Sequence, residues 1–227
     1  MATSGTATFN LDLNQLVEEA FERCGQELRT GYDLRTARRS LNLLTAEWAN
    51  RGINLWTIEE GSINLTNGTA TYNLPADTID LLDHVIRTGT GQNQQDITIS
   101  RISADTYISI PAKNATGRPI QVWINRQATQ PSINVWPTPN QDNTYVFKYW
   151  RLRRIQDAGT GVNTQDIPFR FLPCLVAGLA FYLSMKLPNA GDRTQFLKQE
   201  YEEQWMLAST EDREKADYRL APRPQYL

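Results

Sequence analysis

The stretch FLPCLVAGLAFYLSMKL, residues 171–187, decides the fold because it is apolar on nearly every side of a helix. A helix of this kind must be enclosed by protein or by lipid. It has 17 residues, with Pro173 near its start and Lys186 near its end. It is therefore shorter than the ~20 residues that a membrane span needs. We predict a helix buried in protein, and we expect no membrane as a partner.

Three amphipathic segments are predicted to cover this helix. Residues 13–28 carry an apolar stripe with helical spacing, and Asp12 is placed to cap its start. A second stripe predicts a helix over residues 33–51, which Gly52 ends, and a third predicts a helix over residues 192–210. Together with the apolar helix, these segments predict a four-helix bundle built from both ends of the chain.

The predicted bundle has two consequences. Trp48 ends the apolar stripe of the second helix, so we expect its side chain to pack against the apolar helix. The apolar helix also has more apolar perimeter than three companion helices are expected to cover. We therefore expect the helical part of the chain to form contacts between copies.

The middle of the chain is predicted to be rich in strands. All twelve glutamates fall within residues 18–60 and 200–214, and glutamate favours helices over strands. Residues 62–66 and 69–74 alternate apolar and polar side chains on either side of Asn67-Gly68, which predicts a two-residue hairpin. Further strand-like runs, and one short helix at 103–108, are predicted; the runs are residues 85–88, 97–101, 120–125, 132–136 and 144–150.

The fold class that follows is α+β, with three parts along the chain. A discontinuous helical bundle takes residues 1–52 and 166–217. Residues 53–165 are inserted between its halves as an antiparallel β domain, a small sheet or barrel of about six to eight strands. Residues 218–227 contain two prolines and predict an extended C-terminal tail.

Composition and charge exclude several classes of protein. The chain has 227 residues, of which 40% are hydrophobic and 21% charged, so it is not collagen-like, coiled-coil or largely disordered. Its formal net charge of −2 provides no global positive field that would draw it onto nucleic acid. Cys24 and Cys174 are far apart in sequence, and the first residues lack the pattern of a signal peptide. We therefore expect free thiols in a reducing compartment.

The sequence offers little for catalysis, metal binding or cofactor binding. Its single histidine, His84, stands at the edge of a predicted strand and is expected at the surface or half-buried. One histidine and two distant cysteines do not provide a zinc site, and no carboxylate spacing resembles a calcium loop. Glu59 and Glu60 are expected in a turn rather than as a catalytic acid and base. We predict no catalytic residue, no metal and no cofactor.

Two basic clusters have alternative interpretations. Arg35, Arg38 and Arg39 lie on the second predicted helix, where Glu47 and the glutamates of the first helix are available to balance them. A solvated helix face is favoured there over contact with DNA. The second cluster follows the last predicted strand and is expected either to bind phosphate or, as we favour, to pair with acidic residues across a subunit interface. It consists of Arg151, Arg153 and Arg154.

Three tryptophans on predicted strands leave a glycan-binding role open. Aromatic rings on a sheet can stack on sugars, but large aromatic side chains more often fill the core of the sheet. We favour the core. The tryptophans are Trp123, Trp136 and Trp150.

Several stretches resemble the phage head-to-tail adaptor family, the podovirus-type connectors also called tail tubular protein A. The resemblance covers most of the chain, and its motifs are packing patterns without a catalytic signature. The stretches are ARRSLNLL at residues 37–44, EWANRG at 47–52, LWT at 55–57, FRFLP at 169–173, EYEE at 200–203 and EDRE at 211–214.

The resemblance implies a structural virion protein rather than an enzyme. Members of the family form a ring, usually of twelve copies, beneath the portal of the capsid, and they provide the platform for the tail nozzle. Duplex DNA passes through the ring without sequence-specific binding. The expected location is the neck or tail of the virion, after assembly in the host cytoplasm. A tail-associated cell-wall hydrolase or glycan-binding module is the alternative.

The C-terminal tail is the candidate portal-binding segment, because in related adaptors this segment looks like an arm that reaches up to the portal. Arginines suit acidic portal side chains, prolines limit the conformations that binding must order, and apolar side chains fill pockets. The residues are Arg219, Leu220, Pro222, Arg223, Tyr226 and Leu227.

Overall fold

The computed structural model describes residues 3–29, 31–52 and 55–213. These residues fall into two compact units, which are divided after Trp56 and after Ile155. The helical unit contains the residues before the first division and after the second, and the β unit contains the residues between them. The chain therefore has the α+β class that the sequence predicts.

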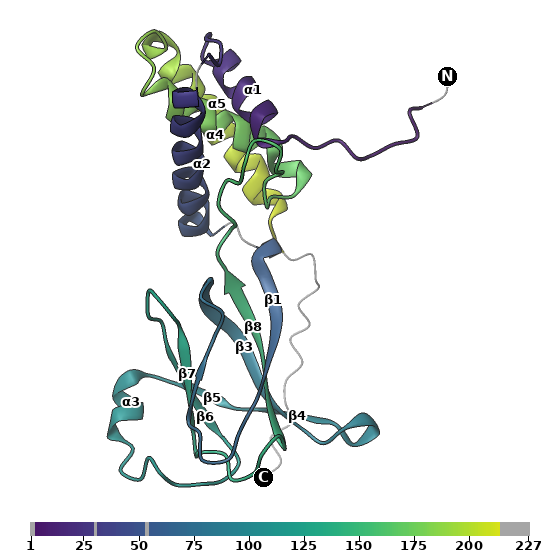
Figure 1. Cartoon of the computed structure of the whole chain (residues 1–227), viewed down its shortest axis with the longest axis vertical. Coiled ribbons are helices and arrows are strands. Elements are labelled where there is room, and N and C mark those ends of the chain that lie inside the picture. The colour runs from purple at the N-terminus through teal and green to yellow at the C-terminus, as the bar shows by residue number, and fades with distance from the viewer. Residues whose placement is uncertain (1–2, 30, 53–54, 214–227) are drawn as a thin grey trace, which may run out of the picture. The chain divides into compact units, whose positions relative to one another are not determined.

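The helical unit contains four α-helices within the described residues (Figure 1). The helix α4, which is the predicted apolar helix, contacts each of the other three. Short 3₁₀ turns, Phe169–Phe171 and Gly191–Arg193, lead directly into α4 and α5. The helices are α1 (Leu13–Arg23), α2 (Gly31–Arg51), α4 (Leu172–Ser184) and α5 (Thr194–Glu211).

The helix α4 is enclosed on almost every side. Ten of its 13 residues are buried, and Pro173 is its one exposed residue. A Cβ atom on Gly178 would lie 2.9 Å from side-chain atoms of Leu44 in α2 and Tyr201 in α5, so glycine is needed where these helices approach. From the sequence we expect apolar side chains of α4 to stay uncovered by the other three helices. This prediction is wrong, because the small residues of α4 let the three neighbouring helices approach closely.

The ends of α1 follow from local chemistry. Asp12 caps the start, as predicted, because its carboxylate accepts a hydrogen bond from a backbone N–H of the first turn. The helix ends before Gly25, which has φ of +75°, and the backbone N–H of Gln26 donates to the carbonyl of Phe21 (3.0 Å). This is the Schellman arrangement of a glycine-terminated helix. The predicted stripe reached Leu28, which lies outside the helix.

The connector of residues 156–166 provides further partners for the start of α1. The backbone carbonyls of Gly161 and Asn163 accept hydrogen bonds from the N–H groups of Asn14 (3.2 Å) and Leu13 (3.0 Å). The first N–H groups of a helix have no partner inside the helix itself. The connector therefore satisfies two of them and is packed into the helical unit.

The β unit consists of two four-stranded sheets, ordered β1-β8-β3-β4 and β2-β7-β6-β5. All neighbouring strands are antiparallel except β5 and β6, which are parallel, so the sheets are mixed and do not form the closed barrel that was one expectation. The expected short helix is present as α3 (Ala104–Ser109). The strands are β1 (Ile58–Asn64), β2 (Thr71–Asn73), β3 (Thr78–Thr88), β4 (Gln95–Thr98), β5 (Ser100–Ile102), β6 (Gln121–Asn125), β7 (Ser132–Trp136) and β8 (Tyr145–Arg153).

The predicted hairpin around Asn67-Gly68 is wrong. The strand β1 pairs with β8, whereas β2 pairs with β7 in the other sheet. A hairpin turn of the expected kind needs positive φ at both central residues, but only Gly68 has it, with φ of +74°. The N–H of Thr69 donates to the carbonyl of Thr66 (3.2 Å), so the turn carries the chain from one sheet to the other.

The core of the β unit lies between its two sheets and takes side chains from both. Phe147 and Tyr149 of β8 are buried in it, whereas Trp150 belongs to the opposite face of the strand and is half-buried. Trp123 and Trp136 are also half-buried and lie outside this core, and the Trp123 ring stacks on Tyr107 of α3 at 5.1 Å. The prediction that the three tryptophans fill the core is therefore wrong.

His84 lies in β3 and is buried rather than exposed or half-buried, with 6% of its surface accessible. Its ring stacks on Phe147, with 5.8 Å between the centroids. Neither ring nitrogen makes a hydrogen bond of normal geometry to a described residue, and an interaction with the backbone of Ile99 is the smallest of the effects on its pKa. Burial lowers the pKa of His84 from its usual 6.5, and the Asp83 carboxylate opposes this shift only in part. The fold therefore holds the neutral imidazole.

We predict that Trp48→Ala destabilises the helical unit by about 3–5 kcal/mol. The indole of Trp48 is fully buried, and its ring centroid lies 6.4 Å from that of Phe171 and 5.8 Å from that of Trp205. Leu43→Ala, at an exposed position of the same helix, is the control and should change stability by less than about 0.5 kcal/mol. Urea denaturation checks this, and equal midpoints for Trp48→Ala and wild type would contradict the packing.

We predict that the β unit loses stability as the pH falls through the ordinary histidine pKa. Below the unfolded-state pKa of 6.5 the unfolded chain takes up a proton at His84, whereas the folded chain, with its lowered pKa, does not. His84→Leu removes this loss. Urea denaturation at about pH 7.5 and about pH 5.5 measures it, because His84 is the only histidine in the chain. An identical pH dependence in both proteins would contradict the burial of a neutral imidazole.

Candidate functional site

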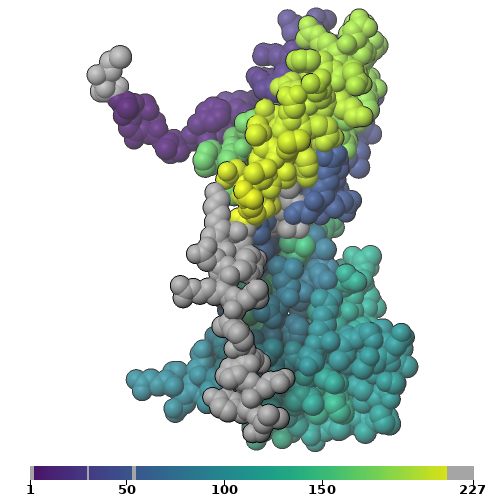
Figure 2. Space-filling view, turned by 180° about the vertical axis from the view of Figure 1, so that it is seen from behind, coloured from purple at the N-terminus to yellow at the C-terminus, as the bar shows by residue number. Residues whose placement is uncertain are grey.

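A partly buried network of side chains joins α2 to α5, and Figure 2 shows the end of α2 (blue) beside α5 (yellow). Trp48 Nε1 donates to the Tyr201 hydroxyl (3.2 Å), and that hydroxyl donates to Glu47 (3.3 Å). The Arg51 guanidinium forms an ion pair with Glu47 (2.6 Å) and donates two hydrogen bonds to Glu202 (3.1 Å each). We call these five residues the α2–α5 clasp.

The tyrosines of this region are hydrogen-bond donors and not bases. The hydroxyl of Tyr182 in α4 donates to Glu47. Burial, together with this hydrogen bond, raises the pKa of Tyr182 to about 12. Burial and the charge of Glu47 also raise the pKa of Tyr201. Both phenols therefore stay protonated near neutral pH, so the clasp and Tyr182 are suited to holding α2, α4 and α5 together rather than to proton transfer.

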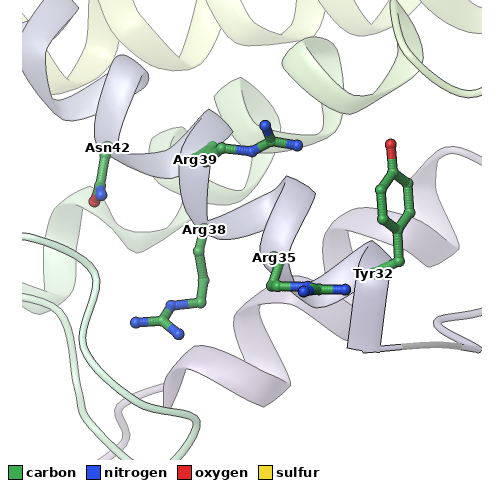
Figure 3. Close-up of a pocket in the computed structure, with 5 residues that line it drawn as sticks. All are labelled: Tyr32, Arg35, Arg38, Arg39 and Asn42. Carbon is green, nitrogen blue, oxygen red and sulfur yellow. The ribbon is translucent and has the colours of Figure 1, made fainter.

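Three of the four arginines of α2, Arg35, Arg38 and Arg39, line a hollow of about 540 Å³ together with Tyr32 and Asn42 of the same helix (Figure 3). Arg38 donates to the backbone carbonyl of Ala158 (3.4 Å), and Arg39 donates to a side-chain hydroxyl of α2. Within the described residues no carboxylate pairs with Arg35, Arg38 or Arg39. The expectation that Glu47 balances them is wrong, because Glu47 pairs with Arg51.

Arg151 and Arg153, which lie in β8, are paired inside the β unit. Arg151 forms ion pairs with Asp77 (2.5 Å) and Glu59 (2.8 Å), and Arg153 forms one with Glu59 (2.6 Å). The hydrogen bonds of Arg151 lower the pKa of Asp77. Arg154 is exposed. The hypothesis that Arg151, Arg153 and Arg154 lie at a subunit interface stays a prediction.

Glu59 and Glu60 belong to β1, and the expectation that they lie in a turn is wrong. Glu59 pairs with Arg151 and Arg153, whereas Glu60 pairs with Lys148 (3.0 Å). Neighbours along a strand point to opposite faces, so each carboxylate has its own cationic partners. This arrangement does not bring an acid and a base to one substrate.

The clasp joins two of the stretches that resemble phage adaptors, EWANRG at residues 47–52 and EYEE at residues 200–203. A family model described as SU10 adaptor protein matches residues 12–223, which is most of the chain. The chain belongs to the SU10 adaptor protein family. It is a phage adaptor, a structural component of the virion that takes part in viral assembly. No curated protein matches the chain.

The described part of this adaptor has neither a cluster of metal-ligating side chains nor a membrane-spanning helix. In residues 3–29, 31–52 and 55–213, no group of three or more histidine, cysteine, aspartate or glutamate side chains is placed to hold a metal ion. The same residues include no helix that is both long enough and apolar enough to cross a membrane. A structural role in the virion requires neither kind of site.

The predicted portal-binding residues lie outside the described residues. They are Arg219, Leu220, Pro222, Arg223, Tyr226 and Leu227, and their role stays a prediction.

The clasp was not predicted from the sequence, although part of it is visible there. Glu47 and Arg51 are four residues apart, the spacing at which a glutamate and an arginine pair on a helix. Tyr201 and Glu202 are separated from them by about 150 residues, and nothing in the local pattern shows that these stretches meet. The resemblance pointed to both stretches without joining them.

We predict that Tyr201→Phe destabilises the adaptor by about 1–3 kcal/mol, because it leaves the buried indole N–H of Trp48 without an acceptor. Tyr182→Phe is the matched control. It also removes a donor to Glu47, but Glu47 keeps its ion pair with Arg51, so the loss should be smaller. Urea denaturation measures both, and equal losses in the two variants would show that the Trp48 hydrogen bond is not important.

Proposed function

We propose that this adaptor is a head-to-tail connector of the podovirus type, resembling tail tubular protein A. In this role it forms a ring between the portal and the tail nozzle, and the ring surrounds the channel through which DNA leaves the capsid. The observation that supports the proposal is the family match over residues 12–223, which includes the resembling stretches at both ends of the chain. Assembly would take place in the host cytoplasm before the virion is released.

A ring of twelve copies is the proposed assembly. Each subunit in a closed ring uses two different surfaces, one for the subunit on each side. Because α4 is already covered by α1, α2 and α5, these surfaces must come from the exposed faces of the outer helices or from the β unit. Among Arg151, Arg153 and Arg154, Arg154 is best placed for such a contact because it is exposed.

The charge of the chain suits a channel that lets DNA pass. A formal net charge of −2 supplies no strong attraction for phosphate, and strong phosphate binding would slow the passage of DNA. We therefore propose transient, sequence-independent passage without a DNA-binding site.

The C-terminal tail is the proposed attachment to the portal. Its arginines suit acidic side chains, and its prolines reduce the conformational entropy lost on binding. No cofactor is part of the proposal. The alternative of a cell-wall hydrolase or glycan-binding module is not put forward, because no observation favours it.

We predict that deletion of residues 218–227 leaves the melting temperature nearly unchanged but greatly weakens attachment to purified portal rings. Binding of the full-length chain should also weaken with added salt, because exposed charge pairs are screened. Electron microscopy of portal mixed with full-length or truncated adaptor shows what fraction of the portals carries an adaptor ring. The full-length adaptor should add a ring of about twelve copies. Attachment of the truncated chain with full-length affinity would show that the tail does not dock, and absence of any ring would contradict the proposed function.

A further inference from the structure

Three arginines near the start of α2 form a surface that has no acidic partner within the described residues. We call Arg35, Arg38 and Arg39 the basic face. Arg35 and Arg39 are exposed and one helical turn apart, and no carboxylate within the described residues pairs with any of the three. Like charges at this spacing destabilise a helix by a few tenths of a kcal/mol per pair. The free subunit therefore carries a repulsion that an acidic partner would relieve.

Apolar side chains adjoin the basic face. A second hollow, of about 400 Å³, is lined by Tyr32, Arg39 and Leu43 of α2 and by Lys186 just beyond α4. Tyr32 is 64% exposed and Leu43 is 58% exposed. Exposed aromatic and aliphatic side chains flanked by arginine are typical of the anchors of a protein interface. Duplex DNA presents a phosphate backbone, for which the exposed aliphatic side chain of Leu43 offers no matching contact.

The opposite charge occurs on α1. We call Glu18 and Glu22 the acidic face. They are exposed, lie one helical turn apart, and have no cationic partner within the described residues, whereas their neighbour Glu19 pairs with Arg23 (3.0 Å). Both glutamates line a hollow of about 850 Å³.

Apolar side chains adjoin the acidic face as well. The same hollow is lined by Phe9 and Phe169, which are 76% and 73% exposed. In Figure 2 the N-terminal segment (purple) meets the green turn that precedes α4. Arg170 also lines the hollow, where its guanidinium lies 5.1 Å from the centre of the Phe171 ring. The acidic face thus combines charge and exposed aromatic rings in the same way as the basic face.

We propose that adjacent subunits of the adaptor join through the basic face of α2 in one copy and the acidic face of α1 in the next. The inference rests on the proposed ring. The hollows at Arg35 and at Glu18 share no residue, and the charges of the two faces are carried by different helices, α2 and α1. Two different, complementary surfaces on one rigid unit are what a head-to-tail contact requires. Charge complementarity identifies the partner as a second copy of this chain.

Two charge-reversal variants test the proposal. The first, Arg35→Glu with Arg39→Glu, makes the basic face acidic and keeps Arg38, which contacts Ala158. The second, Glu18→Lys with Glu22→Lys, makes the acidic face basic. Each variant alone would bring like charges together at every contact, so each should associate at least about tenfold more weakly than wild type. A 1:1 mixture should regain association, because the two variants complement each other at every contact of an alternating assembly.

Sedimentation velocity over a series of protein concentrations, with and without purified portal, measures association. Lys198→Glu is the control, since it reverses an exposed charge on α5 outside both faces. It should assemble as wild type does. Melting temperatures should match in all variants, because these side chains are exposed. Added salt should weaken association of the wild type and of the mixture.

The outcomes separate the inference from the proposed function. If wild type forms no ring with portal, the proposed function fails and the inference fails with it. If wild type forms rings but the variants also do so alone, or their mixture does not, only the inference is overturned. A DNA-binding role would also overturn it. That outcome is a wild type that binds a short DNA duplex, measured by fluorescence anisotropy, and an Arg35→Glu, Arg39→Glu variant that no longer binds the duplex but still forms rings. Loss of association in each variant and its recovery in the mixture support the contact.

Discussion

The burial of α4 is the constraint on which the helical unit depends. A helix that is apolar on nearly every side cannot remain in water, so the chain must supply enclosing helices from both of its ends. Small residues such as Gly178 allow these helices to approach, and the α2–α5 clasp fixes two of them through Trp48 and Tyr201. Because α4 is enclosed within one chain, the surfaces left for other proteins lie on the outer helices, where charged side chains stand beside exposed apolar ones such as Leu43 and Phe169.

How well the sequence predicted the fold depended on whether the signal was local. Helices α1, α2 and α5 were predicted from the spacing of their apolar residues, α4 from its apolar character on nearly every side, and the cap at Asp12 from a single residue. The prediction of a hairpin at Asn67-Gly68 was wrong. Its two flanking strands alternate apolar and polar side chains as a hairpin would, but they pair with distant strands of different sheets. The predicted burial of His84 and of the tryptophans was wrong for a related reason. The opposite sheet decides which face of a strand is covered, and the local sequence does not show where that sheet lies.

The candidate site shows the same limit. The resemblance marked the stretches that hold Glu47 and Tyr201, but their contact joins residues 154 apart and only the fold brings them together. Arg35, Arg38 and Arg39 were correctly placed on a helix, yet their lack of acidic partners became visible only when Glu47 was found beside Arg51. We propose that these unpaired charges connect this fold to assembly in the virion.

A cryo-electron microscopy reconstruction of the virion neck, at a resolution that shows side chains, would show directly how the subunits meet. We expect α4 to be enclosed within each subunit, and α1 and α2 of adjacent subunits to lie at the boundary. A ring in which α4 is exposed and pairs with a neighbouring subunit would contradict this expectation.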